Sequence, residues 1–202
     1  MTGETPKRRK NSNERRTDLV EAAIGLFAMK SYATVTTAQI AQEAGISEAI
    51  IYRHFKSKKD LFLACFKEGI SDYLIERYRR IWRKHRQIPR DYLRFVGLEY
   101  YRFVSERPKR ARFLALMLTA AYDPDISKAL KDFLEINLQA VEKAYQLIFE
   151  QSISPPPIKP RQAAWMFVGH YYTLVAQKEL FPKDFGKKNT EEMLTFSFSL
   201  FG

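Results

Sequence analysis

The stretch of residues 36–60 constrains the fold more than any other part of this chain. Thr36, with Gln39 three residues later, forms the pattern of a capping box, which begins a helix. Gly45 ends this short helix, because glycine readily adopts the positive φ of a helix terminator. Ser47 is a favoured N-cap for a second short helix, and a third helix follows it. Two short helices on a glycine turn indicate a helix-turn-helix unit, a shape typical of DNA-binding proteins that also occurs in ordinary helical cores.

This unit, together with the helix expected before it, resembles the N-terminal domain of the TetR family of transcriptional repressors. The resemblance rests on residues in each of its helices and at the start of the next one. They are Ala22, Ala23, Leu26, Phe27, Thr36, Thr37, Ile40, Ala41, Ala44, Gly45, Ile46, Ser47, Ile51, Tyr52, His54, Phe55, Lys56, Ser57, Lys58, Asp60 and Leu61. The likeness covers about a quarter of the chain. The helical pattern and length of the remainder suit the ligand-binding domain of that family.

The resemblance implies that residues 47–54 form a recognition helix in the major groove of DNA. Its first residues, which would face base edges, are Ser47, Glu48, Ala49 and Ile50. Glu48 and Ile50 depart from the residues common in the family; a carboxylate can accept a hydrogen bond from a cytosine N4, and an isoleucine can contact a thymine methyl. The other DNA-contacting candidates are Tyr52, Arg53, His54 and Lys58, with the Thr36 and Thr37 hydroxyls suited to a phosphate oxygen at a helix N-terminus.

Apolar residues recur at helical spacing through most of the remaining chain, and no segment is read as a strand. The third helix of the unit continues to about Trp82, far enough to connect two domains. Residues 191–201 fit both a strand and a helix, and we predict a helix because no other strand is available to pair with them. We therefore predict an all-α fold in three parts. They are a basic disordered arm at residues 1–12, a helix-turn-helix DNA-binding domain at 13–60 and a helical effector-binding and dimerisation domain at 61–202.

The segment from Arg161 to Leu180 carries apolar residues around nearly its whole circumference, so as a helix it needs cover on every side. A second copy of the chain is the natural cover, and the family resemblance implies that the last two helices form a four-helix dimer interface. The predicted interface residues are Trp165, Phe167, Tyr171, Leu174, Phe198 and Phe201. The formal charge of residues 111–202 is balanced, at 10 basic and 10 acidic side chains, which suits association.

Aromatic residues are abundant in the middle helices, where we expect them first of all to form core. The resemblance implies a cavity there that takes a small-molecule effector. The candidate lining residues are Tyr78, Trp82, Phe103, Phe113, Met117 and Tyr145. Residues 61–110 carry 13 basic and 6 acidic side chains. A hydrophobic or amphipathic, anionic effector such as a fatty acyl thioester is therefore a candidate. The alternative is that these basic side chains only form a solvated surface and bind no effector.

Composition narrows the class of protein further. The net charge of +11 and the pI near 9.7 favour a polyanionic partner such as double-stranded DNA. A single cysteine, Cys65, allows no intramolecular disulfide, no apolar run reaches the ~18 residues of a membrane span, and the N-terminus has no secretory pattern. We thus expect a cytoplasmic protein without a membrane partner. The three histidines have no metal-ligand spacing, and glycine-rich phosphate loops and nucleophile elbows are absent, so we expect no metal, no cofactor and no catalytic residues.

These observations favour a transcriptional regulator that binds a palindromic operator as a homodimer, a repressor released by a small-molecule effector. Two alternatives stay open. One is a helical small-molecule-binding protein, or an enzyme with a cryptic site, whose helix-turn-helix is only structural. The other is a DNA-binding protein with no effector. The effector, the operator, the regulated genes and the choice between repressor and activator lie outside the sequence.

Overall fold

A computed structural model describes residues 11–154 and 156–199, with side chains described up to residue 196. The helices are α1 (Ser12–Phe27), α2 (Thr37–Glu43), α3 (Glu48–His54), α4 (Lys58–Phe66), α5 (Asp72–His85), α6 (Pro89–Glu106), α7 (Pro108–Leu116), α8 (Pro124–Glu150), α9 (Pro160–Leu180) and α10 (Lys187–Ser199). A π-helical turn, η1 (Lys67–Ser71), joins α4 to α5, and a 3-10 turn, η2 (Met117–Ala120), follows α7. No strand occurs within these described ranges, which confirms the all-α prediction. Most of the predicted arm, residues 1–10, lies outside them.

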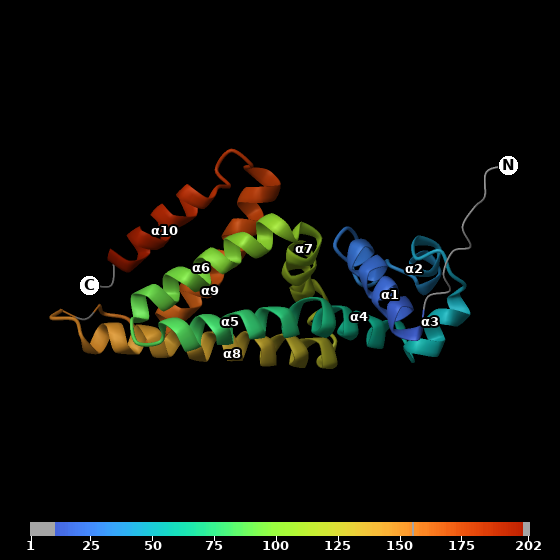
Figure 1. Ribbon diagram of the computed structural model, residues 1–202, viewed down its shortest axis with the longest axis horizontal. Helices are drawn as coiled ribbons and strands as arrows, with labels where there is room; N and C mark the ends of the chain where they lie inside the picture. The colour runs from blue at the N-terminus through green and yellow to red at the C-terminus, as the bar shows by residue number, and fades with distance from the viewer. Residues whose placement is uncertain (1–10, 155, 200–202) are drawn as a thin grey trace.

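The molecule is elongated, with α1, α2 and α3 gathered at one end (Figure 1). A continuous rod of α4, η1 and α5 runs from this small domain along the larger one, with α8 beside α5 (Figure 1). Helices α6 and α9 pack together, α9 also packs on α8, and α10 covers α6. The rod therefore belongs to both domains.

Local capping explains where most helices begin. The Asn11 side chain caps α1 and forms a reciprocal capping box with Glu14, at 2.8 and 2.9 Å. The Asp123 carboxylate accepts from the backbone amides of Asp125 and Ile126 at the start of α8. Proline stands in the first turn of α6, α7, α8 and α9, where its missing amide hydrogen costs nothing.

An aromatic cluster joins the two domains. Phe62 on the rod lies edge-on to Phe27 of α1 and to Phe113 of α7, with ring centroids 4.9 and 5.0 Å away. Lys59 adds ion pairs to Asp123 and Asp125 at 3.3 and 2.5 Å. The small domain is therefore packed firmly onto the larger one through α1, α4 and α7.

The packing of α9 corrects part of the predicted dimer interface. Phe167, Tyr171 and Leu174 are buried within the subunit itself, with exposures of 4%, 6% and 0%. Phe167 packs near Tyr100, and the Tyr171 hydroxyl donates to the Ala111 carbonyl at 2.5 Å. These three residues form the inner face of α9 and are not available to a second copy.

The outer face of α9 carries the apolar residues that remain exposed. Trp165 and Met166 are 51% and 62% exposed in the single chain. Phe198 falls in helical α10, but its side chain lies outside the described residues, as does all of Phe201. Of the predicted interface residues with described side chains, Trp165 alone is on the surface.

Candidate nucleic-acid interface

The turn between α2 and α3 has the geometry that the sequence predicts. Thr36 caps α2 in a capping box with Gln39, and Gly45 takes a φ of +66°. The Ile46 amide then donates back to the Ala41 carbonyl at 3.0 Å, a Schellman-type closure. Ile51 of α3 is fully buried beneath this turn, which fixes the orientation of α3.

The outward face of α3 is solvent-exposed along its length. Its exposed residues are Glu48, Ala49, Tyr52 and Arg53, with Ser47 just before them; Ile50 and His54 are half-buried. Ser47 occupies the N-cap position, as expected, yet in the described structure its hydroxyl makes no capping hydrogen bond. The predicted base-facing residues therefore share one accessible surface at the start of this helix.

A polar contact links α2 to α3 beneath that surface. The Thr37 hydroxyl donates to the Glu48 carboxylate and lies 3.3 Å from the Tyr52 hydroxyl. Thr37 is only 8% exposed. The predicted phosphate contact of Thr37 therefore competes with a bond inside the protein, whereas Glu48 keeps a second oxygen for a base.

Lys58, a predicted phosphate contact, has three backbone partners in the protein. Its ammonium donates to the carbonyls of Tyr32 at 2.9 Å, Val35 at 3.0 Å and Ala33 at 3.5 Å. It also lies 4.5 Å from the centre of the Tyr32 ring, a cation–π distance. This arrangement ties the loop before α2 to the start of α4.

Arg16 of α1 is a positioning residue that the sequence did not reveal. Its guanidinium donates to the His54 carbonyl at the end of α3 at 3.3 Å and forms a 2.5 Å ion pair with Glu68 of η1. It also stacks 4.4 Å from the Phe55 ring centre. The one available signal is that a cation favours a helix C-terminus. Arg16 thus connects the candidate recognition helix to the π turn of the rod.

The larger domain contains a cavity of about 330 Å³ between α5, α6 and α8, here called the α5–α8 cavity. Its lining residues are Ile75, Tyr78, Arg79, Trp82, Arg83, Tyr92, Ile136, Asn137 and Ala140. Tyr78 and Trp82 were predicted to line a cavity. The other candidates, Phe103, Phe113, Met117 and Tyr145, are buried in helix packing and are not among its lining residues. Burial raises the pKa of Tyr78 and Tyr92, so both stay protonated at neutral pH.

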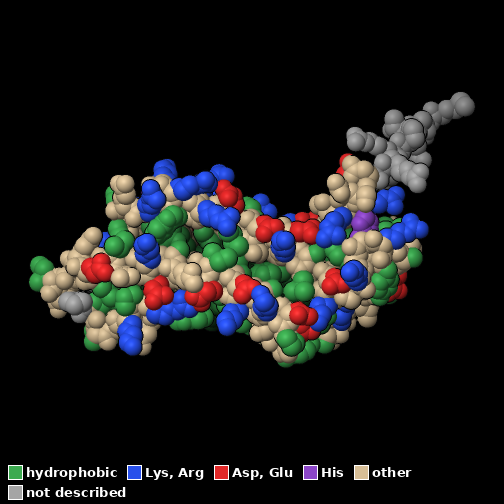
Figure 2. All heavy atoms as spheres, turned by 90° about the horizontal axis from the view of Figure 1, so that it is seen from below, with side chains coloured by type: hydrophobic (Ala, Val, Ile, Leu, Met, Phe, Trp, Pro, Cys, Tyr) green, Lys and Arg blue, Asp and Glu red, His purple; other side chains and the backbone are tan. Residues whose placement is uncertain are grey.

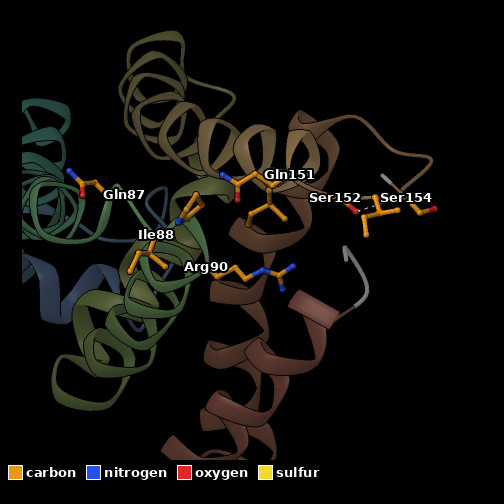
Figure 3. A pocket seen from close by; sticks show the side chains of 9 residues that line it. Gln87, Ile88, Arg90, Gln151, Ser152 and Ser154 are labelled. Carbon is orange, nitrogen blue, oxygen red and sulfur yellow. Dashed lines mark hydrogen bonds between the residues drawn. The ribbon is translucent and has the colours of Figure 1, made fainter.

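A second, more polar hollow of about 600 Å³ lies at the far end of the bundle, between the α5–α6 turn and the end of α8. Figure 3 shows Ile88, Arg90 and Gln151 around an open space, with Ser152 and Ser154 at one side. The Ser154 amide donates to the Ser152 hydroxyl at 3.3 Å. Both this hollow and the α5–α8 cavity open to the surface, and they differ in the polarity of their lining.

The described residues also bear on metal binding, membrane spans and the single cysteine. Among the described residues, no group of three or more His, Cys, Asp or Glu side chains could hold a metal ion. Within the same residues, none of the helices has the length and apolar character to cross a membrane. Cys65 is fully buried, and burial raises the pKa of its thiol well above the ordinary value.

Comparison with known proteins points to one family. Residues 19–65 match the sequence profile described as bacterial regulatory proteins, tetR family. The chain is similar to the nucleoid occlusion factor SlmA of Marinomonas sp. (39% identity over 69 residues, 34% of each chain) and to the HTH-type transcriptional dual regulator CecR of Shigella flexneri (29% over 143 residues, 68% of this chain and 57% of CecR). The chain thus spans about a third of the length of SlmA, and similar or smaller shares of most other relatives that it matches.

Solved structures resemble the whole fold. A TetR family regulator from Marinobacter aquaeolei aligns over 93% of this chain and 95% of its own, with a TM-score of 0.75 and 21% identity. FadR from Bacillus subtilis, solved in complex with stearoyl-CoA, aligns over 91% and 96%, with a TM-score of 0.70 and 19% identity. At such identities the match shows the fold, and residues 19–65 show the family. Residues 19–65 thus identify the helix-turn-helix domain of this chain as one of the tetR family of bacterial regulatory proteins.

Proposed function

We propose that this protein is a transcriptional regulator that binds a palindromic operator as a homodimer and releases it when a small molecule binds the larger domain. The proposal rests on how α3 is held, with one side fixed against the protein and the other exposed to solvent. Its inner side is fixed by buried Ile51 and by the Thr37–Glu48 contact, while Tyr52 and Arg53 face solvent. A helix held in this way can present its first residues to base edges in the major groove.

The charge of the protein supports a DNA partner. The chain carries 34 Lys and Arg against 23 Asp and Glu. Figure 2 shows basic side chains on both the small and the larger domain, interspersed with acidic ones. Such a balance favours association with a polyanion, and the affinity should weaken steeply as salt concentration rises.

The dimer part of the proposal rests on the exposed apolar residues near the end of the chain. Trp165 and Met166 on α9, followed by Leu180 and Phe181 at its end, are all more than half exposed. The two pairs lie at opposite ends of α9, and exposed apolar side chains of this size are candidates for protein–protein contacts. Two copies joined through this surface would place two α3 helices on successive major-groove half-sites.

The effector part rests on the position of the α5–α8 cavity. Tyr78 and Trp82 of α5 line it, and α5 continues through η1 into α4, which packs on the DNA-binding domain. A ligand releases DNA only if it binds the released spacing of the two domains more tightly than the DNA-bound spacing. FadR of Bacillus subtilis, which shares the fold, was solved with stearoyl-CoA, and this supports an effector in the helical domain.

The test is a selection of random duplex DNA on the purified protein, followed by binding measurements on the enriched sequence. We expect a palindromic motif, and we expect Tyr52→Ala to abolish its binding while analytical ultracentrifugation still shows a dimer. Tyr122→Ala is the matched control, because Tyr122 is 71% exposed in the larger domain. If no DNA binds even at low salt, the helix-turn-helix is only structural, and the alternative of a small-molecule-binding protein replaces this proposal.

A further inference from the structure

We propose that the α5–α8 cavity binds a compact hydroxylated aromatic carboxylate, with its hydroxyl between Tyr92 and Asn137 and its carboxylate at the arginines of the cavity mouth. This inference rests on the proposed function, since it names the chemical class of the effector. It is carried by two buried polar groups that lack partners and line the same cavity.

Tyr92 supplies the first of these groups. Its ring is fully buried on α6, and its hydroxyl has no hydrogen-bond partner among the described residues. A buried hydroxyl without a partner is costly, and native proteins contain few such groups. Because Tyr92 lines the α5–α8 cavity, a ligand there that displaces the neighbouring side chains would give this hydroxyl a partner.

Asn137 on α8 supplies the second group. It is 5% exposed, and its amide nitrogen donates to the Tyr100 hydroxyl at 2.7 Å, while its carbonyl oxygen has no partner in the described structure. The Tyr100 hydroxyl can accept from one end of the amide or donate to the other. In either orientation, the second end of the Asn137 amide is left for a ligand.

A hydroxyl is the ligand group that satisfies both residues. A hydroxyl can accept a hydrogen bond from Tyr92 and, with the Asn137 amide as described, donate one to its carbonyl; with the amide reversed it can accept from both, whereas a ligand carbonyl serves the reversed orientation alone. Sites built around buried polar groups reject analogues that lack the matching hydroxyl. The two unpartnered groups therefore specify a hydroxylated ligand.

The walls of the cavity favour an aromatic body. Trp82 and Tyr92 meet edge to face, with centroids 5.0 Å apart and planes at 89°. Tyr78, Ile75 and Ile136 complete an apolar lining. Aromatic rings gain from such offset and edge contacts beyond the area that they bury.

The mouth of the cavity favours a negative charge. Arg79 and Arg83 line it from the exposed side of α5. Arg83 forms an exposed ion pair with Glu76 at 3.2 Å, while the described part of the chain gives Arg79 no ion pair. Since exposed ion pairs are weak, these arginines orient the carboxylate, and the hydroxyl end sets the specificity.

The volume of the cavity sets an upper limit on the size of the ligand. At about 330 Å³, the cavity is at the small end of the ~300–1,000 Å³ range of ligand sites. One ring with a short acid chain fits this space, whereas a complete long-chain acyl-coenzyme A does not.

Trp82 provides a direct reporter, because the chain has only two tryptophans and Trp165→Phe removes the other. The probes are 4-hydroxybenzoate, 4-hydroxyphenylacetate and 3-(4-hydroxyphenyl)propanoate, each compared with its analogue lacking the hydroxyl and with its methyl ester. In the Trp165→Phe protein we expect at least one hydroxylated acid to quench Trp82 and to bind about tenfold more tightly than its deoxy analogue. The methyl ester should bind more weakly than the acid by a smaller factor.

Tyr92→Phe separates the proposed contact from general affinity. We expect the preference for the hydroxyl to fall to about twofold or less in this variant. The unliganded variant should be at least as stable as the parent, because it loses a hydroxyl that has no partner. Tyr122→Phe, which removes an exposed hydroxyl, should keep the preference unchanged.

Several results would overturn the proposal. They are absence of quenching by all three hydroxylated acids up to millimolar concentration, equal affinity for the deoxy analogues, a preference that persists in Tyr92→Phe, and tighter binding of stearoyl-CoA than of the small acids. Operator binding, measured on the protein with Trp165 intact, keeps the two proposals apart. Operator binding without probe binding would refute only the proposed ligand class. Probe binding without any DNA affinity would refute only the proposed regulator function.

Discussion

Replacing Lys58 with methionine separates two roles for this residue. The family resemblance places a phosphate contact here, whereas in the structure the Lys58 ammonium donates to the carbonyls of Tyr32, Ala33 and Val35. Three donors with three acceptors leave no hydrogen for a phosphate. We therefore expect Lys58→Met to act through the stability of the DNA-binding domain.

The geometry fixes the expected size of the effect. Two of the bonds are short, at 2.9 and 3.0 Å, and the third is at the limit of hydrogen bonding, at 3.5 Å. Hydrogen bonds to charged groups contribute about 1.5–3 kcal/mol, and the cation–π contact with Tyr32 adds ~0.5 kcal/mol. Because the site is partly exposed and water can replace the ammonium, we expect a total loss of about 2 kcal/mol. For a chain of this size that lowers Tm by ~4–8 °C.

The assay combines thermal unfolding at fixed protein concentration with operator binding at several salt concentrations. Each phosphate contact contributes ~0.9 to the slope of log affinity against log salt, so two Lys58 contacts per dimer would contribute ~1.8. We expect Lys58→Met to lower Tm and leave this slope unchanged. Exposed Lys30 gives the control for stability, and Lys30→Met should leave Tm unchanged. A slope reduced by ~1.8 with an unchanged Tm would refute the reasoning.

Two further predictions concern the larger domain. A Cβ on Gly97 of α6 would lie 2.5 and 2.6 Å from the two methyl carbons of Leu194 on α10. Gly97→Ala should therefore destabilise the protein by about 1–3 kcal/mol in urea unfolding, and Leu194→Ala should cost less in the Gly97→Ala background than in the parent. Burial lowers the pKa of the His170 imidazole, so its contribution to stability is present above the ordinary pKa of about 6.5 and is lost as pH falls through the folded pKa. The free energy of unfolding should drop between pH 7.5 and 5.5 by less in His170→Phe than in the parent; an equal drop would contradict this assignment.

Features that depend on a few neighbouring residues could be predicted from the sequence. The capping box of Thr36 and Gln39 and the positive φ of Gly45 both appear in the structure as expected. These features are local, because a cap or a turn is decided by the hydrogen bonds and sterics of adjacent backbone. The helix-turn-helix unit is built almost entirely from such features, which is why its residues could be named in advance.

Features that depend on packing between distant segments could not be predicted in the same way. The apolar pattern of α9 does not say which side faces its own subunit, so Phe167 was assigned to the dimer surface with Trp165. Likewise, aromatic composition does not separate core residues such as Phe113 from cavity residues such as Trp82. The π turn at residues 67–71 has no marker in the sequence; it lies between α4, which packs on α1, and α5, which packs on α6 and α8.

The π turn is the point at which the two domains are tied to the rod. Arg16 of α1 binds both Glu68 of the turn and the last carbonyl of α3, while Arg110 of α7 donates to the Gly69 carbonyl at 3.0 Å and pairs with Glu21 of α1. Two guanidinium groups, one from α1 and one from α7, thus hold the π turn against α1. π turns occur frequently at functional sites. Under the proposed function, a ligand beside α5 would act on the rod that carries this turn, and Arg16 would pass the change from Glu68 to the end of α3 without any ligand contact to the DNA-binding domain.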